Sequence, residues 1–270
     1  MTLFSALTAA RQKIDRLDAR LLLQYASGCT HADLLARPET PLSAPAREQF
    51  SAWVDRRAAG EPLAYIVGEA EFRGRVFQVS PAVLIPRPDT EVLINQAKAG
   101  LRGLTAPRIL DLGTGSGIVA ITLALECPAA TVVAVDLAND ALSVARNNAG
   151  RLGARVDFRH GDWFAPVAGE RFDLIVSNPP YIAEGDPHLA GDGLPCEPQL
   201  ALTAGPDGLA CIRHIVAGAP AFLVAGGWLL FEHGHDQGPA SRNLLTEAAF
   251  KAASTYPDLA GSDRVSGAFI

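Results

Sequence analysis

The chain has 270 residues, 49% of them hydrophobic and 19% charged, a composition typical of a globular protein with a large buried core. Its formal net charge is −6, and the excess of acid lies after residue 80, where 13 Lys and Arg stand against 20 Asp and Glu. This balance disfavours broad electrostatic capture of nucleic acid and favours a protein or a small molecule as substrate. No apolar run reaches the length of a membrane span, and the N-terminus lacks a signal-peptide pattern.

The four cysteines are scattered along the chain, and no two of them form a Cys-x-x-Cys pair. This spacing favours reduced thiols over a disulfide framework or a metal site. We therefore expect a cytoplasmic protein without a bound metal. The cysteines are Cys29, Cys127, Cys196 and Cys211.

Residues 1–70 are expected to form a small helical domain. Its first apolar residues recur at helical spacing, and a further helix is expected over Ala46–Ala58, ending at Gly60-Glu61-Pro62. The domain carries no catalytic signal, so it is either a structural cap or a docking module for a macromolecular substrate, and the sequence leaves both open. The first apolar residues are Leu3, Phe4, Leu7, Ala10, Ile14, Leu17, Leu21 and Leu22.

Residues 71–84 are expected to form a hairpin linker that turns at Gly74. The segment that follows, Ile85-Pro86-Arg87-Pro88, has an extended backbone because its prolines restrict φ. Its first two residues could form a wall beside the substrate. A helix should then run to about Leu101.

Residues 85–270 are expected to form an α/β domain. From Arg108 onward, short apolar strands alternate with helices, a pattern that predicts a mostly parallel sheet with right-handed crossovers. The carboxyl ends of parallel strands share one edge of a sheet, which is where such folds bind ligands. The expected strands are Arg108–Leu112, Thr131–Val135, Val156–Arg159, Phe172–Ser177 and Trp228–Glu232, with Ala253–Tyr256 and Arg264–Ile270 as further edge strands.

The first strand runs into a glycine-rich turn, Gly113-Thr114-Gly115-Ser116-Gly117, which lets a ligand approach the backbone closely. A dinucleotide fingerprint needs its third glycine where Ile118 stands, and no Lys-Ser/Thr pair follows as in a phosphate-binding loop. Asp111, just before the turn, would repel a pyrophosphate and attract an ammonium group. The turn therefore indicates a ligand without phosphates.

Two further strands also end in carboxylates. Asp136 is placed to hold ribose hydroxyls. Asp162 could accept a hydrogen bond from an adenine amino group while Trp163 packs on the base. Together with Asp111 and the glycine turn, these residues indicate a nucleoside that carries an amino-acid-like cation. S-adenosyl-L-methionine has this structure, so we expect it as the co-substrate.

The motif Asn178-Pro179-Pro180-Tyr181 follows the buried strand Phe172–Ser177. Neither proline can donate an N–H, so strand pairing ends there and the carbonyls of Asn178 and Pro179 stay free for a ligand. The side-chain oxygen of Asn178 and the Pro179 carbonyl are two acceptors that fit a planar –NH2 group. The motif predicts chemistry on an amino or amide nitrogen, with Asn178 and Pro179 as catalytic residues and with Tyr181, Ile85 and Pro86 packed against the substrate.

In this order, the motifs resemble those of the peptide chain release factor glutamine methyltransferases, the HemK/PrmC family, over nearly the whole chain. The glycine turn marks only class I methyltransferases, and Asn-Pro-Pro-Tyr marks only those that methylate nitrogen. The proline-rich segment after a helical N-terminus selects this family. The matching motifs are Ile85-Pro86-Arg87-Pro88-Asp89-Thr90-Glu91, Asp111 to Gly117, Ala134-Val135-Asp136, Asp162-Trp163-Phe164, Ser177 to Ile182, Glu197-Pro198 and Glu232-His233-Gly234.

The resemblance implies a class I methyltransferase fold, with a doubly wound and mostly parallel sheet and a small helical N-terminal domain. It implies transfer of a methyl group from S-adenosyl-L-methionine to the side-chain amide of the glutamine in the Gly-Gly-Gln motif of class 1 release factors. It also implies that Gly113 to Gly117, Asp136, Trp163 and Asn178 bind the donor, and that Asn178 to Tyr181 bind the glutamine.

Two other functions are weighed against this one. A methyltransferase for exocyclic amines of DNA or RNA can share the Asn-Pro-Pro-Tyr turn, but it must flip a base and grip phosphates, which the acidic sheet domain disfavours. We therefore expect no direct sequence-specific binding of nucleic acid. A cofactor-binding protein that transfers nothing is disfavoured because every expected strand end carries its motif.

Two segments have no assigned function. His233-Gly234-His235 lacks further ligands at metal-site spacing, so we interpret it as a polar strand end. Residues 184–208 are rich in glycine and proline and could form a mobile lid or a docking loop, which the sequence leaves open.

Overall fold

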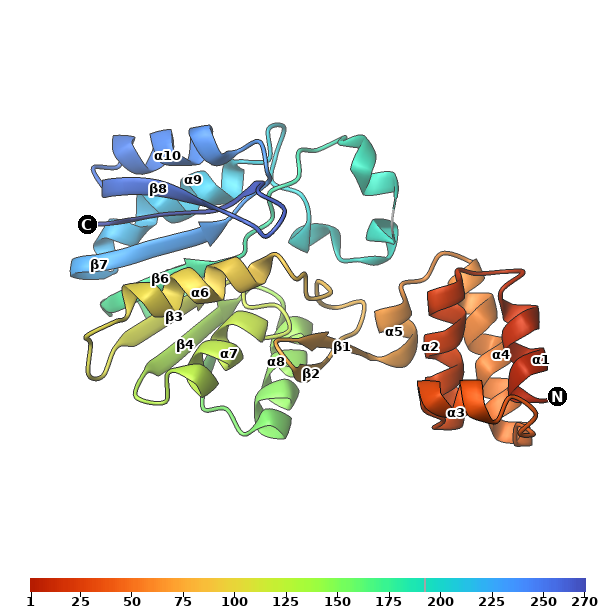
Figure 1. The fold of residues 1–270 in the computed structure, drawn as a ribbon. Coiled ribbons are helices and arrows are strands. Elements are labelled where there is room, and N and C mark those ends of the chain that lie inside the picture. Colours follow the sequence, from red (N-terminus) through yellow and green to blue (C-terminus); the bar gives the residue numbers. More distant parts are fainter. Residues whose placement is uncertain (192) are drawn as a thin grey trace. The chain divides into compact units, whose positions relative to one another are not determined.

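The computed structural model describes residues 1–191 and 193–270 (Figure 1). Residues 1–69 and 190–196 form one compact unit, and residues 70–189 and 197–270 form a second, larger one. Among the residues that the structure describes, no helix is both long enough and apolar enough to cross a lipid bilayer.

The first unit is helical, and side-chain caps define where its helices begin. The Thr2 hydroxyl accepts a hydrogen bond from the backbone N–H of Ser5, and Asp15 and Ser43 cap the second and fourth helices in the same way. The helices are α1 (Leu3–Ala10), α2 (Arg16–Ser27), α3 (His31–Ala36), α4 (Ala44–Ala58) and α5 (Leu63–Val67).

The buried face of α1 consists of Leu3, Ala6 and Ala10. Phe4 and Leu17 lie outside the buried faces of their helices, with exposed fractions of 59% and 49%. Both residues stand at helical spacing from other apolar residues, so the apolar pattern alone did not define the buried faces, which also use alanines: Ala6 and Ala10 in α1 and Ala19 in α2.

The expected hairpin forms from β1 (Glu69–Phe72) and β2 (Arg75–Gln78). Arg73 and Gly74 between them both have positive φ, as a two-residue turn of this kind requires. Helix α6 (Thr90–Gly100) begins directly after the proline-rich segment.

A seven-stranded sheet forms the centre of the second unit, in the order β5-β4-β3-β6-β7-β9-β8. The strands from β3 to β7 are parallel, and β9 pairs antiparallel with both β7 and β8. The strands are β3 (Arg108–Leu112), β4 (Thr131–Asp136), β5 (Asp157–His160), β6 (Phe172–Ser177), β7 (Leu223–Glu232), β8 (Lys251–Pro257) and β9 (Asp263–Phe269).

One expectation about the sheet is wrong. The two last strands were both expected at the edge, but only β8 lies there. Strand β9 lies between β7 and β8. Its residues Val265 to Ala268 are buried and pair with β7. Strand β7 also begins earlier than expected, at Leu223 rather than Trp228.

Helices cover both faces of the sheet, so the expected doubly wound α/β fold is confirmed (Figure 1). Alternate residues of each strand face opposite ways: Ile109 packs with α6 and α7, whereas Leu110 packs with α9 and α10. The helices are α7 (Ile118–Glu126), α8 (Asn139–Leu152), α9 (Ala210–Gly218) and α10 (Gly238–Glu247). Short 3-10 helices lie at η1 (Ala165–Val167), η2 (Pro187–Ala190), η3 (Leu194–Cys196), η4 (Gln199–Ala201) and η5 (Ala219–Ala221).

The strand order reverses at β3, which has β4 on one side and β6 on the other. In open α/β sheets, ligands bind beyond the carboxyl ends of the strands at such a switch point. The glycine turn follows β3 and the Asn-Pro-Pro-Tyr turn follows β6, so the fold brings both to this place.

Candidate active site

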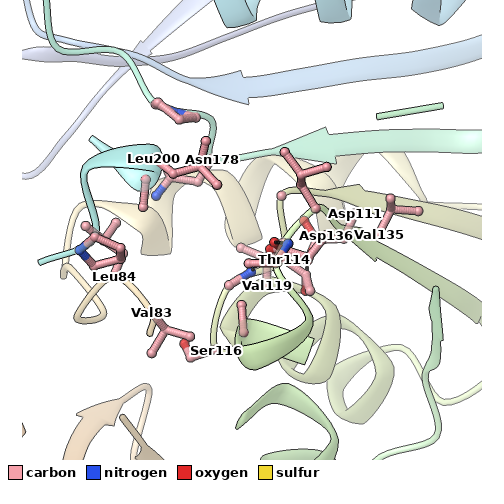
Figure 2. A pocket seen from close by; sticks show the side chains of 18 of the residues that line it. Val83, Leu84, Asp111, Thr114, Ser116, Val119, Val135, Asp136, Asn178 and Leu200 are labelled. Carbon is pink, nitrogen blue, oxygen red and sulfur yellow. Dashed lines mark hydrogen bonds between the residues drawn. The ribbon is translucent and has the colours of Figure 1, made fainter. Parts of the chain in front are cut away.

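A cavity of about 290 Å³ lies at the carboxyl ends of β3, β4 and β6. Its volume is close to the lower end of the range for ligand pockets, about 300–1,000 Å³. Figure 2 shows Asn178 on one side of it, with Thr114 and Asp136 on the side of the glycine turn. The other residues that bear on its chemistry are Val83, Leu84, Ile85, Pro86, Arg87, Asp111, Gly113, Gly115, Ser116, Val119, Leu137, Asp162, Trp163, Pro180, Leu200 and Cys211.

The glycine turn is held against β4 by its backbone. The N–H groups of Gly113 and Thr114 both donate to the Val135 carbonyl, at 2.9 and 3.1 Å. Gly117 has a φ of 85°, and a Cβ there would lie 2.7 Å from the Ile121 side chain. Only glycine therefore fits at the point where the turn enters α7.

Asp111 is buried beneath this turn. Its Oδ2 accepts hydrogen bonds from the Thr114 hydroxyl at 2.6 Å and from the Ala120 N–H at 3.2 Å. Burial nevertheless raises the pKa of Asp111 to about 7. A ligand cation near this carboxylate would favour its charged form. The contact between Asp111 and an ammonium group remains a prediction.

Asp136 lies at the end of β4 and lines the cavity. Its Oδ2 accepts the Gly115 N–H and its Oδ1 accepts the Ala138 N–H, each at 2.8 Å. Burial raises the pKa of Asp136, while these two backbone donors oppose the rise. Each oxygen keeps a second lone pair, so the carboxylate has room for the two hydroxyls of a ribose.

Asp162 and Trp163 follow β5 and both line the cavity, as the sequence predicted for an adenine site. Trp163 has an unusual φ of 41°, and its ring lies 5.7 Å from that of His214. A large residue in this region of backbone space is strained, which is common at ligand sites. The adenine contacts themselves remain a prediction.

The Asn-Pro-Pro-Tyr turn is divided between the cavity and the core. Asn178 and Pro180 line the cavity, and the Asn178 Nδ2 donates to the Thr90 Oγ1 at 3.2 Å. Of the residues that the structure describes, those lining the cavity do not include Pro179 or Tyr181. The Tyr181 hydroxyl instead donates to Oε1 of Glu232 at 3.2 Å, and burial raises the pKa of this hydroxyl. Contact of Pro179 and of Tyr181 with a substrate stays a prediction.

A buried carboxylate joins two walls of the cavity. The side chain of Glu197 is 1% exposed, accepts the Ile85 N–H at 3.1 Å and pairs with Arg87. The expected proline-rich wall is therefore fixed to the segment that carries Leu200, whose side chain is largely exposed at the cavity.

The sequence did not single out Thr90, Glu197 or Glu232 as parts of the site. Each of these residues belongs to a longer family motif, but no local sequence pattern indicates that a carboxylate or a hydroxyl will be buried beside the site. The structure brings Thr90 and Glu232 behind Asn178, and Glu197 beside the proline-rich wall.

Within the described ranges, no three His, Cys, Asp or Glu side chains gather in a way that could hold a metal ion. Both ring nitrogens of His233 are engaged, Nε2 with the Ser266 hydroxyl at 2.8 Å and Nδ1 with the Gly234 carbonyl at 2.7 Å. This histidine is a satisfied residue at the end of a strand.

Known proteins share both the sequence and the fold. The PrmC N-terminal domain family matches residues 2–68, and the methyltransferase small domain family matches residues 88–191. A solved 16S rRNA N2 methyltransferase from T. thermophilus, in complex with AdoMet and guanosine, has a TM-score of 0.54 at 25% identity, over 74% of this chain and 49% of that chain.

Two curated relatives extend over almost the entire chain. The release factor glutamine methyltransferase of Neisseria gonorrhoeae is 51% identical over 94% of this chain and 93% of its own length. That of Bordetella pertussis is 49% identical over 95% of this chain and 96% of its own length. The chain therefore belongs to the release factor glutamine methyltransferase family.

Proposed function

We propose that this chain transfers a methyl group from S-adenosyl-L-methionine to the side-chain amide nitrogen of the glutamine in the Gly-Gly-Gln motif of class 1 release factors. The proposal rests on the names of its relatives and, above all, on one observation: Asn178 donates through Nδ2 to Thr90. Its Oδ1 makes no hydrogen bond within the described residues and is free for a substrate N–H. Such a substrate would place the chain in the cytoplasm.

The residues around the cavity fit the donor. Asp136 offers a lone pair on each oxygen for the ribose, and the apolar side chains of Val119 and Leu137 suit a purine ring. Asp111 lies below the turn, where a nearby ammonium group would stabilise its charge. When bound, the donor supplies a methyl group on a positively charged sulfur.

The substrate amide needs to be positioned because its nitrogen lone pair is delocalised into the carbonyl. Asn178 Oδ1 and the Pro179 carbonyl would each accept one N–H and so fix the plane of the amide. Both acceptors also stabilise positive charge that develops on the nitrogen. Positioning of this kind contributes about 7–11 kcal/mol to a barrier. Transfer leaves a neutral thioether and a positively charged N-methylated amide, which is strongly acidic and loses its extra proton to water, so no side chain is needed as a base.

We further propose three domains, namely a helical domain over residues 1–70, a hairpin linker over 71–84 and the methyltransferase domain over 85–270. We assign docking of the release factor to the helical domain, because it exposes large apolar side chains that its own core does not use, among them Phe4 and Leu35. Replacing both by Ser should raise KM for a whole release factor and leave KM for a short Gly-Gly-Gln peptide unchanged. Equal effects on both substrates would contradict this assignment.

Incubation with labelled methyl donor tests the activity. The wild-type protein should label a class 1 release factor and leave separate samples of DNA and RNA unlabelled. A release factor in which the Gly-Gly-Gln glutamine is replaced by Ala should remain unlabelled. Label on nucleic acid alone would instead favour the base-modifying alternative, and label on none of them would refute both.

A further inference from the structure

A polar network lies behind the Asn-Pro-Pro-Tyr turn and away from the cavity. Thr90 begins α6 and Glu232 ends β7, and both residues are fully buried. Thr90 accepts the Asn178 Nδ2 at 3.2 Å, and Glu232 accepts the Tyr181 hydroxyl at 3.2 Å. The Thr90 hydroxyl also faces the Glu232 carboxylate and favours its charged form. A buried polar network of this kind requires an explanation, because burying a carboxylate is costly.

The Asn178 amide could present either its NH2 group or its Oδ1 to Thr90. Thr90 Oγ1 accepts the Asn178 NH2 group, and a nearby ionised Glu232, which can only accept hydrogen bonds, supports this role by attracting the Thr90 hydroxyl proton. The lone pairs of Thr90 Oγ1 then face Asn178, which must present its NH2 group to them. Because the amide is planar, its Oδ1 lies on the opposite side. The hydrogen bond to Thr90 thereby determines which way round the Asn178 amide stands, and the charge on Glu232 favours this orientation.

Glu232 acts on the other end of the turn as well, through its direct bond from the Tyr181 hydroxyl. Its Oε2 has no hydrogen-bond partner among the described residues. The other charged groups that act on it are Arg264 from β9, which favours its charged form, and Asp89 before α6, which opposes it. Arg264 is itself bound to Asp89 at 3.3 Å. Stability alone would favour an apolar residue here.

We propose that Thr90 and Glu232 are positioning residues that hold the two ends of the Asn-Pro-Pro-Tyr turn, Thr90 through Asn178 and Glu232 through Tyr181, so that Asn178 presents an oxygen and not an NH2 group to the substrate amide. The inference rests on the proposed function, since it concerns recognition of an –NH2 group. With the Asn178 amide inverted, two NH2 groups would face each other, and the substrate would lose one acceptor.

Thr90→Val tests the relay, because valine has nearly the same shape as threonine but no hydroxyl. We expect kcat for release factor methylation to fall about 10²-fold, as on removal of one preorganised hydrogen bond from an active site. Affinity for the methyl donor should not change. Thr90→Ser keeps the hydroxyl and should restore kcat to within about threefold of the wild type.

Thr122→Val is the matched control. Thr122 is a fully buried threonine of α7 in the same unit, and its hydroxyl has no hydrogen-bond partner in the described part of the chain. Its replacement should leave kcat unchanged. A readout without turnover is the affinity for a release factor in the presence of S-adenosylhomocysteine, which should weaken about tenfold in Thr90→Val only.

The pH dependence separates a positioning role from a structural one. Burial raises the pKa of Glu232 to about 7, and Asp111 has a similar value, so both titrate in the same range. Wild-type kcat should fall as the pH is lowered through about 7, because protonated Glu232 no longer attracts the Thr90 hydroxyl proton. At saturating methyl donor, where titration of Asp111 affects donor binding and not turnover, Glu232→Gln should have a low kcat at every pH and should lack this dependence.

The outcomes of this series are distinct. Wild-type kcat in Thr90→Val, or a Thr90→Ser variant as impaired as Thr90→Val, would overturn the positioning role. A pH dependence of kcat that persists in Glu232→Gln would overturn the part assigned to Glu232. A wild-type protein that does not methylate release factors would refute the proposed function instead.

Discussion

Asn148 connects the glycine turn to the hairpin, and replacing it tests whether this connection supports donor binding. The residue is fully buried on α8. Its Nδ2 donates to the carbonyls of Gln78 at 3.0 Å and Ser116 at 2.9 Å, and its Oδ1 accepts the Gln78 N–H at 2.7 Å. Three hydrogen bonds at about 0.5–1.5 kcal/mol each give a total of about 1.5–4.5 kcal/mol.

In Asn148→Ala, water can replace some of these hydrogen bonds and so reduce the loss of stability. Gln78 is exposed, so its backbone groups can bond to solvent, whereas the bond to the Ser116 carbonyl is buried. We therefore expect the free energy of unfolding to fall by about 2–3 kcal/mol. Affinity for the methyl donor should fall about tenfold, because the glycine turn loses its support.

Urea unfolding and calorimetric titration with S-adenosyl-L-methionine measure these two effects. Asn147→Ala is the matched control, since Asn147 is the preceding residue of the same helix and is exposed. It should change neither quantity. If Asn148→Ala behaved like Asn147→Ala, the turn would not depend on this connection and the reasoning would be refuted.

Three further predictions concern the same unit. Glu197→Gln removes the charge that holds Arg87. It should lower the free energy of unfolding by about 1.5–3 kcal/mol and raise KM for the release factor. An unchanged KM would show that the proline-rich wall does not touch the substrate. Burial raises the pKa of Asp111 to about 7, so the folded state binds this proton more tightly than the unfolded state does. Asp111 therefore lowers the free energy of unfolding as the pH rises from about 4 to 7, by up to about 1.4 kcal/mol per pH unit. Asp111→Asn should remove that part of the slope in melting experiments between pH 5 and pH 8, and an unaltered slope would contradict the assignment. Gly117→Ala should be more destabilising than Gly103→Ala. Both glycines have a positive φ, but only a Cβ at Gly117 would also clash with a neighbour, at a further cost of about 1–3 kcal/mol. Equal losses of stability in chemical denaturation would argue against close packing at the turn.

The positions of the glycine turn and of Asp136 and Asn178 could be predicted from the sequence because each lies at the end of an apolar strand. Parallel strands end at one edge of their sheet, so a local pattern is enough to bring these residues together. The fold class follows in the same way, from the alternation of strands and helices.

The place of β9 could not be predicted, because strand order depends on pairing between distant segments and not on the local pattern. The direction of the Tyr181 side chain could not be predicted for the same reason. Its partner Glu232 lies on another strand, and only the folded sheet brings the two together. Thr90 gave no local signal either, since a threonine at the start of a helix is common.

Peptide mapping by mass spectrometry tests the central claim most directly, that Asn178 presents an acceptor to a substrate amide beside the bound methyl donor. A class 1 release factor is incubated with the donor and either the wild-type protein or Asn178→Ala, under single-turnover conditions. We predict one added methyl group on the Gly-Gly-Gln glutamine with the wild type, and a rate lower by about 10²-fold or more with the variant, whose donor affinity changes little. An unmodified glutamine after prolonged exposure to the wild type, or a near-normal rate in Asn178→Ala, would contradict the account.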